Sequence, residues 1–197
     1  MKKSEKFILI FLFSFFILLL VFLVFLKVKE KFLKYSSVYI FLIKQEKETS
    51  YLIPVVRNIG FYKKRIEDRI EYAIKELLKG PTTEEKGMGF STAIDENIKL
   101  LDVSLEDGIV NLNFSKEVEE GGGTLLMETR ISQIVCTATQ FPEVKKVRFL
   151  IEGKTIQYFS GEGITLVEKP IGREDLKEFE IKIIKEEEYE KGDSSGI

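Results

Sequence analysis

The chain has 197 residues with no histidine, no tryptophan and one cysteine, and its formal net charge is −2. The absence of histidine excludes His-based acid/base catalysis, Ser-His triads and histidine metal sites, and a lone cysteine excludes an intrachain disulfide and cysteine-cluster metal sites. Charge is distributed unevenly: the first 35 residues carry seven lysines and two glutamates, whereas the other 162 carry 23 basic and 30 acidic side chains. A basic, apolar head therefore precedes one acidic globular domain that is long enough to bury a core.

The head contains a run of 20 residues, Phe7–Leu26, in which Ser14 is the only polar residue. A helix of this length spans about 30 Å, the thickness of the hydrocarbon core of a bilayer. The run is longer than the apolar core of a secretory signal peptide and lacks a small-residue cleavage site. We therefore predict an uncleaved signal anchor, a transmembrane helix that crosses the cell membrane once. Lysines flank both of its ends, so charge alone does not fix its orientation.

The first part of the globular region predicts two strands and a helix. Val38–Ile43 is a continuous apolar run typical of a buried strand. Tyr51–Arg57 is a second strand, in which Pro54 favours a position at a sheet edge. Lys63–Lys79 has apolar residues at the spacing of one helical face, and Gly80-Pro81 ends that helix.

The clearest local signal is a β-hairpin centred on Asp107-Gly108. Apolar and polar residues alternate from Leu101 to Leu105 and again from Val110 to Phe114, as in two strands with one wet face. A second amphipathic helix is expected to follow, with Thr124 as its N-cap.

The remaining pattern completes the expected fold. Val147–Ile151 predicts a further strand and Ile164–Val167 a short one. This order predicts the α+β class, as a β-α-β-β-α-β-like module with two helices on one face of a mostly antiparallel sheet. Tyr51–Arg57 and Val147–Ile151 are the strands expected at the sheet edges, where a homo-oligomer could form.

The chain is thus expected to comprise five segments. They are a short tail (1–6), the transmembrane helix (7–26), a juxtamembrane linker (27–37), the globular domain (38–173) and a charged C-terminal tail (174–197) whose last six residues are expected to be disordered.

No residues form a recognisable catalytic, cofactor-binding or metal-binding constellation, so we predict a protein that is not an enzyme and needs no cofactor. Glu117–Glu120 lacks the ligand spacing of a Ca²⁺ loop, and Gly121–Gly123 is not followed by the Lys-Ser/Thr of a phosphate-binding loop. Cys136 is expected to pack as a small apolar side chain. The acidic domain also argues against nucleic acid as a partner.

Two polar features are candidate binding surfaces. One is the wet face of the hairpin, with Asn111 and Asn113, and the other is the loop that contains Gly89 and Ser91. Either could bind peptidoglycan or another cell-wall ligand.

Several motifs of the globular region resemble the GerMN domain, a family named for a sporulation and spore-germination protein of Gram-positive bacteria. They are Leu77-Leu78-Lys79-Gly80-Pro81, then Gly89 and Ser91, the hairpin from Val103 to Asn113-Phe114-Ser115, and Thr137-Ala138-Thr139-Gln140-Phe141-Pro142-Glu143-Val144 leading into Val147–Gly153. The resemblance covers roughly Val38 to Arg173. Here there is one copy behind an apolar helix, where the germination protein has two tandem copies and a lipid-bearing cysteine.

The resemblance implies an extracytoplasmic, membrane-anchored and non-catalytic domain, with a fold similar to modules that assemble into rings in the sporulation secretion apparatus. We therefore expect a structural or assembly component of the cell envelope, or of a sporulation or germination complex. Its expected partners are the membrane, copies of itself and other envelope proteins. A peptidoglycan-binding or other wall-binding module is the alternative.

Overall fold

A computed structural model of the chain describes residues 3–47, 49–60, 65–159, 163–178 and 182–184. The chain divides into two compact units, Met1–Ser37 and Val38–Ile197. The first unit is helix α1 (Lys3–Ser36), which includes the predicted span and continues through the residues expected to form a linker. Its side chains from Leu12 to Val28 are exposed. No helix among the residues that the structure describes meets the length and hydropathy criteria for a membrane-crossing segment.

In the described part of the second unit, the strands form two four-stranded sheets. Sheet A has the order β3-β1-β2-β8, and sheet B has the order β4-β5-β6-β7. The elements are β1 (Ser37–Glu46), β2 (Thr49–Asn58), α2 (Ile66–Lys79), α3 (Thr83–Gly87), β3 (Phe90–Ser91), β4 (Leu100–Glu106), β5 (Ile109–Phe114), the 3₁₀ helix η1 (Lys116–Glu119), α4 (Thr124–Ala138), β6 (Lys146–Ile151), β7 (Lys154–Thr155), the 3₁₀ helices η2 (Thr165–Glu168) and η3 (Arg173–Glu178), and β8 (Lys182–Ile183).

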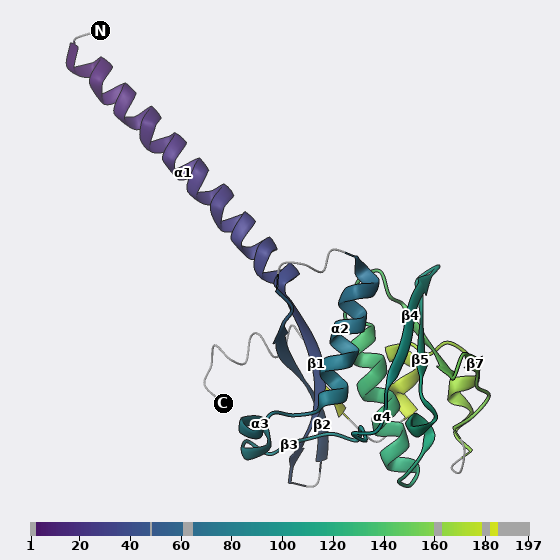
Figure 1. Cartoon of the computed structure of the whole chain (residues 1–197). Coiled ribbons are helices and arrows are strands. Elements are labelled where there is room, and N and C mark those ends of the chain that lie inside the picture. The colour runs from purple at the N-terminus through teal and green to yellow at the C-terminus, as the bar shows by residue number, and fades with distance from the viewer. Residues whose placement is uncertain (1–2, 48, 61–64, 160–162, 179–181, 185–197) are drawn as a thin grey trace. The chain divides into compact units, whose positions relative to one another are not determined.

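Helices α2 and α4 pack side by side between the two sheets (Figure 1). The apolar faces of both helices and the inward side chains of both sheets form one core, which includes Ile40, Leu52, Ile74, Leu112, Ile134 and Phe149. Strand β5, helix α4 and strand β6 make a parallel β-α-β crossover inside sheet B. The α+β class is therefore confirmed.

The prediction of one mostly antiparallel sheet is wrong. β2 belongs to sheet A and does not enter sheet B, and the β5–β6 and β2–β8 pairings are parallel. Local chemistry at β2 explains the separation. Pro54 has no N–H to donate, the Val56 carbonyl accepts from its neighbour Arg57 at 3.2 Å, and the Asn58 carbonyl accepts from the Tyr72 hydroxyl at 2.7 Å. These groups are not available to another strand.

The local turn and cap predictions can be checked individually. The β4–β5 hairpin is confirmed, because Asp107 (φ 50°) and Gly108 (φ 79°) form the left-handed two-residue turn that such hairpins need. Gly80 (φ 71°) ends α2 as predicted, and its N–H donates to the Leu77 carbonyl. The N-cap of α4 is Gly123 and not Thr124, so that prediction is wrong by one residue.

The C-terminal part differs further from expectation. Ile164–Val167 is not a strand, because Thr165–Glu168 is a 3₁₀ helix and only Ile164 makes an isolated bridge. Part of the segment expected to be a tail is folded, since Leu176 is buried in the core and β8 pairs with Tyr51 and Leu52. The disorder expected for 192–197 concerns residues outside those described.

The edge positions also differ. Val147–Ile151 is not at an edge, because β6 lies between β5 and β7 and Val147 bridges to Ile171. Tyr51–Arg57 lies beside β1, and the described residues of β8 pair with its other side at Tyr51 and Leu52. Among the described residues, the terminal strands of sheet B are β4 and the two-residue β7.

Near its start, the outer edge of β1 is closed by side chains in and just after α4, whereas β3 pairs with this edge further along the strand. The Gln140 amide accepts from the Tyr39 N–H and donates to the Tyr39 carbonyl, both at 2.7 Å. Thr137 accepts from the Phe41 N–H at 3.2 Å, and Gln133 donates to the Phe41 carbonyl at 2.7 Å. Buried backbone groups need such partners, so these bonds attach sheet A to the helix layer.

Helix α3 is held against sheet A by an ion pair. The Arg57 guanidinium donates to both carboxylate oxygens of Glu85 at 2.7 Å, and the two side chains are only 13% and 11% exposed. Glu85 also completes a capping box with Thr82 at the start of α3. The hydrogen bond from Arg57 is the main cause that holds the pKa of Glu85 below its ordinary value, with burial acting in the opposite direction.

Gln133→Leu should lower the free energy of unfolding by about 2–4 kcal/mol, because it leaves the Phe41 carbonyl and the Ala93 N–H buried without their partner. Urea denaturation of the full chain measures this. Gln45→Leu is the matched control, since Gln45 is exposed and bonds only within its own hairpin, and should change stability by less than about 0.5 kcal/mol. Equal effects of the two changes would contradict the anchoring role of α4.

Glu85→Gln should lower the free energy of unfolding at neutral pH by about 1–3 kcal/mol. A carboxyl whose pKa is lowered by folding adds stability above its ordinary pKa of 4.5, and this stability is lost as the pH falls through the lower folded value. The difference between variant and wild type should therefore shrink in acid, as urea denaturation on both sides of this range would show. Glu84→Gln, on the exposed side of α3, should have little effect at either pH. A gap that does not shrink in acid would contradict this role of the carboxylate.

Candidate interaction surfaces

The outer face of sheet B carries polar side chains in cross-strand rows. One row contains Ser104, Asn111 and Arg148, and the next contains Asp102, Asn113 and Leu150. The alternate residues of β5, Val110, Leu112 and Phe114, are buried. The predicted hairpin with one wet face is therefore confirmed, and its asparagines lie on that face.

Asn111 lies at the centre of this polar face. Its amide donates to the Ser104 hydroxyl at 3.1 Å, and the Arg148 guanidinium lies 3.5 Å from its oxygen. These three groups are held by neighbouring strands and are not completely buried. Chemically, the row offers a hydroxyl, an amide and a guanidinium to a polar ligand.

Asn113 has a structural task that the sequence did not indicate. Its side-chain oxygen accepts from the Gly153 N–H at 2.8 Å and so fixes the turn between β6 and β7. The neighbouring Ser115 bonds in both directions with the backbone of Lys99, at 2.9 and 3.0 Å. The Asn-Phe-Ser end of the hairpin therefore stabilises the fold.

Gly89 and Ser91 lie in a different part of the domain. Gly89 follows α3 with φ 85°, and Ser91 is an exposed residue of β3 that pairs with Ile43 in sheet A. The structure thus separates the four candidate residues: Asn111 and Asn113 lie in sheet B, Ser91 lies in sheet A, and Gly89 lies in the turn before Ser91. That they bind a ligand remains a prediction.

A groove that the sequence analysis missed lies beside the first turn of α4. It encloses about 700 Å³ and is lined by Ile43, Gln45, Ser50, Leu125, Leu126 and Lys182, among others. Leu125 is 58% and Leu126 is 39% exposed, which is unusual for leucines on a helix that is otherwise largely buried. The sequence signal was Leu125-Leu126, one residue after three consecutive glycines.

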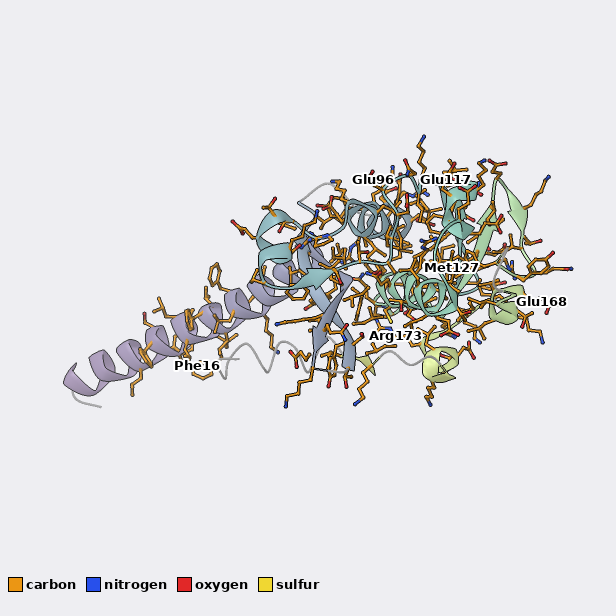
Figure 2. The ribbon with its side chains drawn as sticks, turned by 90° about the horizontal axis from the view of Figure 1, so that it is seen from below. Phe16, Glu96, Glu117, Met127, Glu168 and Arg173 are labelled. Carbon is orange, nitrogen blue, oxygen red and sulfur yellow. The ribbon has the colours of Figure 1, made fainter. Side chains whose placement is uncertain are left out.

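The acidic loops do not form a metal site within the described residues, because no three acidic or cysteine side chains lie close enough there to share an ion. Glu96 and Glu117 lie at the surface of the second unit (Figure 2). A hydrogen bond from the Ser115 hydroxyl is the main cause that lowers the pKa of Glu117, and the Asn97 N–H does the same for Asp95. Both carboxyls are therefore ionised at neutral pH and are poor proton donors.

The buried polar groups of α4 hold loops in place. Arg130 is 2% exposed and donates to the carbonyls of Ala93, Val118 and Glu120 at 2.9, 2.7 and 2.9 Å. Burial lowers the pKa of this guanidinium, and the charge of Asp95 acts against that shift. Cys136 is buried in the core, as predicted.

These features define the class of protein: an α+β domain whose buried polar side chains secure its loops and strands and whose outer faces carry exposed polar residues. The chain belongs to the Germane family, described as "Sporulation and spore germination", whose model matches residues 37–157. The resemblance found in its motifs is therefore confirmed. The chain is a GerMN-type domain related to sporulation and germination proteins.

The chain is similar to the spore germination protein GerM of Bacillus subtilis (strain 168), with 29% identity over 120 residues, which is 59% of this chain and 31% of that protein. The solved tandem GerMN domains of this sporulation protein superpose with a TM-score of 0.56 at 27% identity, covering 71% of this chain and 46% of that one. This chain therefore spans about a third of the curated relative and about half of the tandem structure.

A more distant structure shows the same fold. A putative lipoprotein from Clostridium perfringens superposes with a TM-score of 0.51 at 20% identity, covering 74% of this chain and 92% of that one. At this identity the likeness shows the fold alone.

Proposed function

We propose that the chain is a membrane-anchored, non-catalytic module that acts outside the cytoplasm. In this role it is a structural or assembly component of the cell envelope, or of a sporulation or germination complex. The observation that carries the proposal is the combination of a GerMN-type domain at 37–157 with the apolar run Phe7–Leu26 directly before it.

The proposed anchor rests on the apolar surface of α1. Aliphatic and aromatic side chains follow one another from Leu12 to Leu26 with Ser14 as the only interruption, so they cover every side of the helix. A helix that is apolar all round needs a surrounding apolar medium. The proposed medium is the bilayer.

A non-catalytic role is supported by the tasks of the polar residues. Gln133, Thr137 and Gln140 bind the edge of β1, and Arg130 binds loop carbonyls. The carboxylates that might have served in acid/base chemistry are either at the surface or, like Glu85, paired with arginine. General acid/base catalysis by carboxyls requires one with a raised pKa, and the shifted carboxyls described above are all lowered.

A reporter enzyme that is active only outside the cytoplasm, fused after Ile197, tests the proposed topology. We expect activity from the full chain, because in the proposed topology the short N-terminal head lies in the cytoplasm and one span places the domain on the opposite side of the membrane. Deletion of residues 7–26 is the control and should abolish the activity while the fusion protein is still made. Activity of a cytoplasm-specific reporter at the same fusion point would contradict the proposal.

A wall-binding module is the second candidate, favoured by the row of Ser104, Asn111 and Arg148 on the open face of sheet B. The hydroxyl, amide and guanidinium of this row match the hydroxyl, acetamido and carboxylate groups of peptidoglycan.

Retention of the full chain on purified cell wall in mild detergent tests this candidate. Asn111→Ala should weaken retention, because it removes the central hydrogen-bonding group. Asn113→Ala tests the other face residue and needs a parallel check of folding, because Asn113 also holds Gly153. Ser91→Ala tests the other candidate surface, at β3 of sheet A, in the same assay. Equal retention of wild type and Asn111→Ala would remove the hairpin face as the binding surface.

A further inference from the structure

Strand β4 is one of the two terminal strands of sheet B, and the other is the two-residue strand β7. It pairs with β5 along six residue pairs, and no described strand pairs with its other side. Its seven residues make it the longest strand of this sheet. A terminal strand of this length presents a row of backbone N–H and C=O groups that can pair with another chain.

The pairing pattern shows which groups face outward. The two-residue turn makes Glu106 and Ile109 a hydrogen-bonded pair, and such pairs alternate with non-bonded ones along an antiparallel ladder. Ser104 and Asp102 therefore bond to β5, whereas Val103 and Leu105 direct their N–H and C=O groups to the open side. The pairing of β5 with β6 agrees with this pattern. The Lys146 N–H donates to the Gly108 carbonyl, so Gly108 and the alternate residues that follow it in β5 direct their backbone groups to β6 and not to β4.

Several features of β4 favour pairing. Its outward-bonding residues, Val103 and Leu105, are apolar and only half-buried, and Leu101 is 51% exposed at a bulge. The strand has no proline and no charged side chain on its core side. Of the usual protections of an edge it carries the bulge between Leu100 and Asp102 and the outer-face charges of Asp102 and Glu106. In β2, by contrast, Pro54 and the bonds to Val56 and Asn58 provide such protection.

The strand is also complementary to itself. In an antiparallel pair of two copies, Val103 of one copy can lie opposite Val103 of the other. Asp102 of each copy then lies opposite Ser104 of the other copy. A serine hydroxyl can donate to the carboxylate at both places. On the opposite face of the sheet from these polar pairs, Leu105 then lies opposite the exposed Leu101 of the other copy.

Neighbouring registers are less favourable. A shift of the dyad to Ser104 places Asp102 opposite Glu106, and a shift to Asp102 places two Asp102 side chains opposite each other. Like charges directly opposite one another destabilise a strand pair, so the charge pattern disfavours both of these registers relative to the Val103 register.

We propose that β4 is a homodimerisation edge, at which two copies of the chain pair antiparallel about Val103 to join their B sheets into one continuous sheet. The interface is isologous, since each copy contributes the same residues. The proposal does not depend on the topology or the wall-binding role proposed above, and its test reports on strand pairing alone.

Oxidative cross-linking tests the register. In the full chain in detergent, Val103→Cys should form an intermolecular disulfide, because paired Cα atoms at the dyad would lie about 5.5 Å apart, within the range of a disulfide. Glu106→Cys is the control and should not cross-link, because its two copies would lie about 20 Å apart along the strands. The native Cys136 is buried and should not react. Cross-linking of Glu106→Cys but not Val103→Cys would overturn the register.

Sedimentation equilibrium of the full chain in detergent tests the dimer itself. Ser104→Asp should raise the dimer dissociation constant by about tenfold or more, because it places a carboxylate opposite Asp102 twice. The fold should survive, since position 104 is exposed and Asn111 can donate to the new carboxylate. Thr155→Asp, an exposed change on β7 at the opposite end of the sheet, should leave the constant unchanged. A wild-type monomer, or a dimer that Ser104→Asp does not weaken, would overturn the proposal.

Discussion

The structure depends on the bonds between polar side chains in and just after α4 and the outer edge of β1 at Tyr39 and Phe41. Gln133, Thr137 and Gln140 take the positions that a neighbouring strand would occupy and bond to the backbone of Tyr39 and Phe41. α4 is at the same time the crossover helix between β5 and β6. One helix therefore joins both sheets, and without these side chains the edge of β1 would be buried with unpaired amides, at a free-energy cost for each group.

This arrangement explains how far the sequence could predict the fold. Periodicity located both amphipathic helices and the hairpin at Asp107-Gly108, because those patterns reflect local burial and turn geometry. It could not show that β1 is completed by amide and hydroxyl side chains, since Gln133 and Thr137 look like ordinary polar residues of a helix. Without knowledge of that contact, the order of elements suggests one sheet that begins with Tyr51–Arg57.

The candidate sites were harder to predict for a related reason. A polar residue in a sequence can serve the fold or a ligand, and only its contacts distinguish the two. Asn111 and Asn113 have the same alternation in β5, yet Asn113 fixes the Gly153 turn while Asn111 lies in an open row with Ser104 and Arg148. Sheet edges are hard to predict for the same reason, because β4 is an edge only in an arrangement in which no other strand pairs with its outer side.

The residues that identify the family are chiefly those that build the fold. Gly80 ends α2, Asn113 and Ser115 bind backbone, and Gln140 binds β1. Family membership therefore transmits the architecture and says little about the ligand or partner, which must contact other residues. In this chain such residues lie along the outer edge of β4, in the row around Asn111 and in the groove at Leu125 and Leu126. The exposed side chains among them, such as Ser104, Leu125 and Leu126, lie outside the buried core, so a contact made there leaves the bonds that hold the two sheets together unchanged.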